Sequence, residues 1–105
     1  ASKMIDLTDV DGRGPLHATC CFGHWECTSL LVEKGASLDL KDKDHMTPLH
    51  LAAFNGCNLS MTYLIEKGAN VQLMNNEGIT PLHYAAFKGH ITTVHMLCQK
   101  GCPTS

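Results

Sequence analysis

Apolar residues recur at helical spacing in short segments of this chain. Met61, Leu64 and Ile65 fall three and four residues apart, which predicts a helix over about residues 58–67 with one buried face. The same register, shifted by a constant step, predicts related helices earlier and later in the chain. Helices of this kind are expected at about 25–34, 58–67 and 91–100.

A proline opens a second set of helices. Proline suits the first helical position because its missing N–H has no partner there, and Thr47 and Thr80 precede it as predicted N-caps. These helices are expected at 15–22, 48–55 and 81–88. Glycines then allow a sharp turn between the helices and a left-handed C-cap after the second one. The turn glycines are Gly23, Gly56 and Gly89, and the capping glycines are Gly35, Gly68 and Gly101.

The step is 33 residues, from Pro15 to Pro48 and from Pro48 to Pro81. A period of this length is typical of stacked helix pairs, in which each repeat contacts only its neighbours. We expect one domain over 1–105 with three repeats. The predicted boundaries are 1–10 (the tail of a preceding repeat), 11–43, 44–76 and 77–105.

The phrase T-P-L-H-x-A-A-x-x-G, followed by an aliphatic helix and E-K-G-A, resembles the ankyrin repeat from Asp11 to Gly101. The resemblance implies an all-α ankyrin-repeat solenoid of helix–turn–helix units joined by short β-hairpin loops. It also implies that the chain holds a protein or peptide partner. The motif histidines His17, His50 and His83 would be framework residues that hydrogen-bond backbone between repeats.

Two positions depart from the repeat pattern. Gly14 replaces the threonine before the proline, so we expect His17 to be held more loosely. His45 stands at a hairpin tip where Gly12 and Gly78 stand in the other repeats. A non-glycine residue with positive φ costs about 1 kcal/mol. Either this turn has adjusted, or His45 is retained for a contact.

The resemblance implies partner contacts from the hairpin tips and the last turn of each first helix. The predicted contact residues are Arg13, Cys21, Phe22, Lys43, Asp44, His45, Met46, Phe54, Asn55, Asn76, Glu77, Ile79, Phe87 and Lys88, with Val10 and Asp11 beside them. Phe54 and Phe87 share one register position, and Met46 and Ile79 share another. We expect an exposed apolar stripe rimmed by charges. The alternative is that each phenylalanine packs on its neighbouring repeat.

Composition narrows the function. A net charge of −2 argues against nucleic acid, which needs a basic face. The chain has no long apolar run for membrane insertion and no signal-peptide stretch at its beginning. The 6 cysteines fit repeat positions as reduced thiols, which favours a cytoplasmic or nuclear protein. No cofactor and no small-molecule substrate are expected.

Cysteines and histidines gather between His17 and Cys27, and zinc favours such ligands. The repeat register assigns most of them to framework positions on differing helix faces, and no paired C-x₂-C occurs. Thiol catalysis by Cys21 needs a water-excluding pocket that a flat solenoid surface lacks. We therefore expect the chain to bind no metal ion and to have no enzymatic activity. The alternatives left open are a passive spacer within a longer array and, less favoured, a Cys/His metal site or thiol enzyme.

Neither end of the sequence carries a polar capping helix. Met4 and Ile5 open the chain, and Ile91 and Val94 lie in its last helix. We expect the chain to be an excerpt of a longer array, with weak self-association through uncapped ends.

Overall fold

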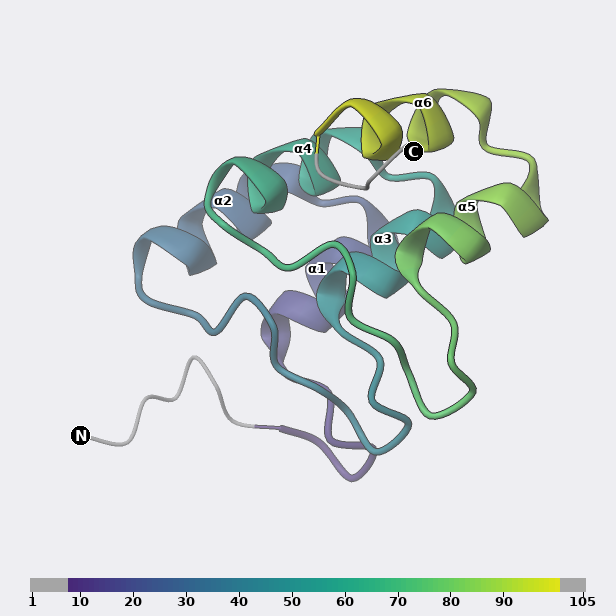
Figure 1. Ribbon diagram of the computed structural model, residues 1–105. Helices are drawn as coiled ribbons and strands as arrows, with labels where there is room; N and C mark the ends of the chain where they lie inside the picture. Colours follow the sequence, from purple (N-terminus) through teal and green to yellow (C-terminus); the bar gives the residue numbers. More distant parts are fainter. Residues whose placement is uncertain (1–7, 101–105) are drawn as a thin grey trace.

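The computed structural model describes residues 8–100, which form six helices arranged as three pairs (Figure 1). The helices are α1 (Pro15–Phe22), α2 (Trp25–Glu33), α3 (Pro48–Asn55), α4 (Asn58–Glu66), α5 (Pro81–Lys88) and α6 (Ile91–Lys100). The predicted helix ranges are confirmed to within a residue. Residues 1–7 of the predicted tail of a preceding repeat (1–10) and the predicted cap at Gly101 lie outside the described residues.

The first helix of each pair begins as its sequence predicts. The Thr47 hydroxyl accepts a hydrogen bond from the His50 N–H at 3.3 Å, and Pro48 follows as the first helical residue. Gly56 ends this helix with a φ of 70°, a conformation that is easy only for glycine. Gly14 has no hydroxyl, so His17 keeps only the 3.2 Å bond from the Gly14 N–H to its Nδ1 at this end.

The helix pairs stack so that α3 lies between α1 and α5, and α4 lies between α2 and α6 (Figure 1). Leu49, Met61 and Leu64 of the middle pair are completely buried. Cys20 and Ala53 share a register position and are also completely buried, as their small side chains predict. Ala86 at the same position is exposed, because within residues 8–100 no helix covers α5 from the other side.

The loops between pairs are hairpin-shaped turns that project to the same side of the stack (Figure 1). Residues 8–100 contain no β-strand, so the predicted β-hairpins are tight turns instead. In the second turn, the Asp42 side chain holds the backbone in this tight form: its Oδ1 accepts hydrogen bonds from the N–H groups of Asp44 and Met46, each at 2.8 Å. Neighbouring turns share single backbone bonds, such as Asn76 N–H to Asp44 C=O at 3.0 Å.

His45 has a φ of 63° and is the one non-glycine residue in the described chain with a positive φ. The turn has therefore not adjusted to the loss of glycine: Gly12 and Gly78 have φ values of 79° and 76°. The His45 side chain is exposed.

We expect His45→Gly to raise the free energy of unfolding by about 0.5–1 kcal/mol. The relief of left-handed strain, about 1–2 kcal/mol, exceeds the added freedom of glycine in the unfolded chain. Denaturant unfolding measures the change. A variant less stable than the parent would mean that the imidazole makes a stabilising contact.

Candidate partner-binding surface

Two buried histidines fix the turns relative to one another. His17 Nε2 donates to the Met46 carbonyl at 2.7 Å, and His50 Nε2 donates to the Ile79 carbonyl at 2.8 Å. Burial lowers the pKa of both imidazoles, so both are neutral at pH 7. Each bond reaches from a first helix to the following turn. The predicted framework role of His17 and His50 is confirmed, and it gives the turns a rigid base.

Two ion pairs join the first and second turns. Arg13 Nε donates to Asp42 Oδ2 at 3.1 Å, and Lys43 Nζ lies 3.0 Å from Asp11 Oδ1. The Asp42 side chain is fully buried. Burial alone would raise the pKa of Asp42, but the Met46 N–H and the Arg13 guanidinium outweigh it and hold the pKa below its ordinary value.

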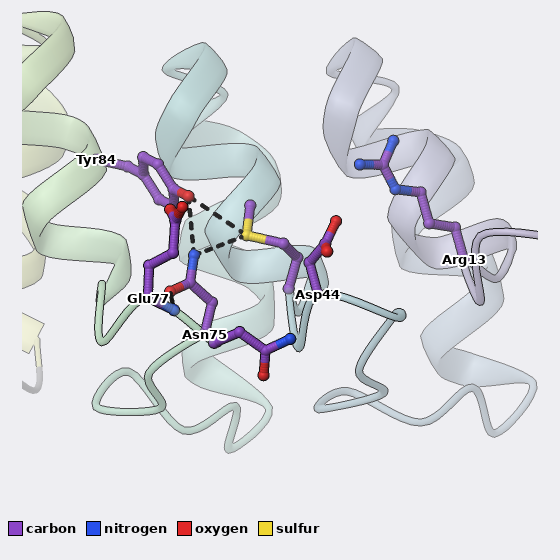
Figure 2. Close-up of a pocket in the computed structure, with 7 residues that line it drawn as sticks. Arg13, Asp44, Asn75, Glu77 and Tyr84 are labelled. Carbon is purple, nitrogen blue, oxygen red and sulfur yellow. Dashed lines mark hydrogen bonds between the residues drawn. The ribbon is translucent and has the colours of Figure 1, made fainter.

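The contact between the second and third turns is neutral. Asn75 takes the register position of Asp42, and its Nδ2 donates to Met46 Sδ at 3.2 Å and to Tyr84 Oη at 2.9 Å (Figure 2). Asn76 takes the position of Lys43, and its Nδ2 donates to the Lys43 carbonyl at 3.3 Å. A cavity of about 400 Å³ opens here, between the turns and the Tyr84 side chain of α5.

Met46 is buried, so the prediction that it belongs to an exposed apolar stripe is wrong. Only 9% of it is exposed, because Asn75 and Tyr84 from the next repeat contact its sulfur. Tyr84 in turn is a lining residue that the sequence analysis missed. The same register position holds Leu51 and Ala18 in the other repeats. This difference between repeats, together with the aromatic hydroxyl of Tyr84, is the sequence feature that could have indicated a contact residue here.

The three phenylalanines differ in exposure. Phe22 and Phe87 are 73% and 75% exposed, whereas Phe54 is 39% exposed. Phe54 meets the Tyr84 ring edge-on at 5.4 Å between centroids, and Lys88 Nζ lies 4.7 Å above the Phe54 ring. Phe54 is thus partly packed on its neighbouring repeat, as the alternative interpretation has it, and Phe22 and Phe87 offer the free aromatic faces.

The remaining predicted contact residues also lie on this side of the stack. Asn55 Nδ2 donates to the Leu51 carbonyl at 3.0 Å and reaches Cys21 Sγ at 3.6 Å across the repeat boundary. Ile79 is half-buried, and its carbonyl accepts from His50. Lys43, Asp44, His45, Asn76, Glu77 and Lys88 are exposed. We call the exposed turns together with the last turns of α1, α3 and α5 the tip surface.

Two cysteines near the ends of first helices, Cys20 and Cys57, are poor nucleophiles. Burial raises the pKa of Cys20 to about 12, and burial also raises the pKa of Cys57. In the described part of the chain, no three His, Cys, Asp or Glu side chains gather as a metal site. Nothing in this part of the molecule therefore adds support to the metal or thiol-enzyme alternatives.

A regular stack of helix pairs with parallel projecting turns defines a helical-repeat solenoid. The family model described as "Ankyrin repeats (3 copies)" matches residues 2–75, and the model described as "Ankyrin repeats (many copies)" matches residues 57–98. The chain belongs to the ankyrin-repeat family. Ankyrin repeats are generally protein–protein interaction modules without enzymatic activity. No curated protein matches the chain, and no helix within residues 8–100 has the length and apolar character needed to cross a bilayer.

Proposed function

We propose that this chain binds a protein or peptide partner through the tip surface. The observation that carries the proposal is the pair of free aromatic faces, Phe22 at the end of α1 and Phe87 near the end of α5. Aromatic side chains, phenylalanine among them, are enriched at protein interfaces and often anchor them. The buried histidine bonds support the same idea, since pre-organised turns lose little entropy when a partner binds.

The proposal includes a cytoplasmic or nuclear location. The cysteines of the described residues, Cys20, Cys21, Cys27, Cys57 and Cys98, are free thiols, which suits a reducing compartment. Imaging of the tagged protein in cells would test the location independently of the binding experiments.

We expect Phe22→Ala and Phe87→Ala each to weaken partner binding by at least about tenfold, as for interface aromatics. The free energy of unfolding should change by no more than about 0.5 kcal/mol, because the side chains are exposed. The partner would be recovered by affinity capture, identified, purified and titrated against each variant.

Leu59→Ala is the matched control, since Leu59 is an exposed apolar residue on α4, away from the turns. It should leave the partner affinity unchanged. Equal losses from Leu59 and the phenylalanines would move the binding site off the tip surface. Unchanged affinity in all three variants would mean that the phenylalanines do not anchor the partner, whereas failure to recover any partner would favour the passive-spacer alternative.

A further inference from the structure

The turns carry an acidic residue at one register position in every repeat: Asp11, Asp44 and Glu77. Asp11 pairs with Lys43 of the next turn at 3.0 Å. The corresponding cation for Asp44 would come from residue 76, but that residue is Asn76. Within residues 8–100, the carboxylates of Asp44 and Glu77 have no ion pair. The second turn therefore provides a cation, Lys43, for the acidic residue of the first turn, whereas the third turn provides the neutral Asn76 for Asp44.

The second ion pair of the first interface is missing from the second as well. Arg13 and Asp42 are replaced in register by Met46 and Asn75, whose side chains make a neutral contact. The two neutral replacements lie at the cavity of about 400 Å³, which Asp44 and Glu77 also line. The cavity thus lies at the interface where Met46 and Asn76 stand in register for the cations Arg13 and Lys43, although Arg13 itself lines one side of it.

The lining of this cavity combines charge with apolar surface. Figure 2 shows Asp44 and Glu77 on either side of the group formed by Asn75, Tyr84 and the methionine sulfur, with Arg13 farther away beyond Asp44. The positive charge of Arg13 is already matched by the buried Asp42 carboxylate. Lys43 also acts electrostatically on Asp44, but its ammonium group lies against Asp11. A bound side chain would meet two carboxylates that lack a direct ion pair, over a partly aromatic floor. That combination suits a cation on a long apolar stem.

We propose that this cavity receives a basic side chain, arginine or lysine, from the bound partner. The proposal rests on the proposed partner-binding function and names the chemistry of one contact. The guanidinium or ammonium group takes the place of the missing cation opposite Asp44 and also reaches Glu77. Exposed ion pairs are individually weak, so this contact selects partners with a basic residue and leaves most of the affinity to the aromatic anchors.

The test uses a small probe so that it does not depend on finding the partner. The ¹⁵N-labelled protein is titrated with N-acetyl-arginine-methylamide, with the corresponding lysine compound, and with the neutral citrulline compound. We expect the arginine and lysine probes to shift the backbone amide signals of Asn76 and Glu77 and the side-chain amide of Asn75. The citrulline probe, which has nearly the same shape, should bind at least about fivefold more weakly.

Variants of the protein test whether the carboxylates of Asp44 and Glu77 bind the cationic probe. The double variant Asp44→Asn/Glu77→Gln should weaken the arginine probe by at least about fivefold. Its fold should be intact because neither carboxylate makes a hydrogen bond or a direct ion pair within residues 8–100. The matched control is Glu33→Gln/Glu66→Gln, which changes the net charge equally at exposed positions on α2 and α4. Asn76→Lys restores the missing cation in the chain itself, so it should also weaken the probe by at least about fivefold.

Three results would overturn the proposal: equal binding of the citrulline probe, unchanged binding by the Asp44/Glu77 double variant, or an equal loss in the Glu33/Glu66 control. These results are separate from the test of the proposed function. If they occur while Phe22→Ala and Phe87→Ala still weaken the partner, the function stands and the basic contact is wrong. If the probe behaves as expected while those variants leave partner binding unchanged, the aromatic anchoring is wrong and the basic site stands.

Discussion

Leu49→Ala is expected to lower the free energy of unfolding by about 2–5 kcal/mol, the usual cost of emptying a buried leucine site. Leu49 lies on α3, the middle helix of its row, and is 0% exposed. Neighbouring helix pairs pack on both sides of α3, so little room exists for the structure to collapse into the cavity. Denaturant unfolding with a common m-value measures the loss.

The matched control is Leu82→Ala, at the same register position on α5. The sequence predicts equal losses for the two leucines, but Leu82 is only half-buried, because α5 has a neighbour in its row on one side alone within residues 8–100. We expect Leu82→Ala to cost clearly less than Leu49→Ala. Equal losses would contradict the idea that stability depends on how many neighbouring repeats cover a position.

His50→Ala is expected to lower the free energy of unfolding by about 2–5 kcal/mol. The imidazole donates to the Ile79 carbonyl at 2.8 Å and accepts from the Thr47 N–H at 3.2 Å. His50 is completely buried. Removing it leaves the buried Thr47 N–H without a partner, which costs about 1–3 kcal/mol. The Ile79 carbonyl keeps one donor, the Asn75 N–H at 3.0 Å, and the emptied imidazole site adds the cost of a buried cavity. The third turn also loses its tie to α3, so amide hydrogen exchange at Gly78 and Ile79 should become faster.

His83→Ala is the matched control. His83 has the same place in the motif and the same bond from Thr80 N–H at 3.2 Å, but it is exposed and its Nε2 has no partner in the described residues. We expect a loss of less than about 1 kcal/mol. If the two alanine variants lose the same stability, the bridge to the following turn contributes nothing.

The pH dependence gives a second readout for His50. Burial lowers its pKa from the ordinary 6.5, so the fold prefers the neutral ring and the unfolded chain takes up the proton first. The stabilisation is complete above about pH 6.5 and is lost as the pH falls from there through the lowered pKa. The unfolding midpoint of the parent should fall on acidification below pH 6.5, and His50→Ala should reduce that slope. His17, whose pKa burial also lowers, accounts for the slope that remains.

The candidate site depended on contacts that the sequence left open. Exposed Phe22 and Phe87 agree with the predicted apolar stripe, but Met46 does not, because Tyr84 and Asn75 of the next repeat cover it. The charges at Asp44 and Glu77 were predicted at the tips. The cavity beside them could not be predicted, since it depends on how side chains of two turns meet across the repeat boundary.

The sequence by itself determined the repeat, the helices and their ends. The repeat is visible directly as a step of 33 residues. The proline after Thr47 or Thr80 and the glycines at the turns act through bonds within a few residues of the chain, so local rules are sufficient to predict the helix ends. Only the tertiary structure decided what each repeated residue does. Leu49 and Leu82, or His50 and His83, are the same residue in the same motif, yet one of each pair is buried between repeats and the other is not. Burial depends on the neighbouring repeat, and the free energy of a side chain follows from what covers it.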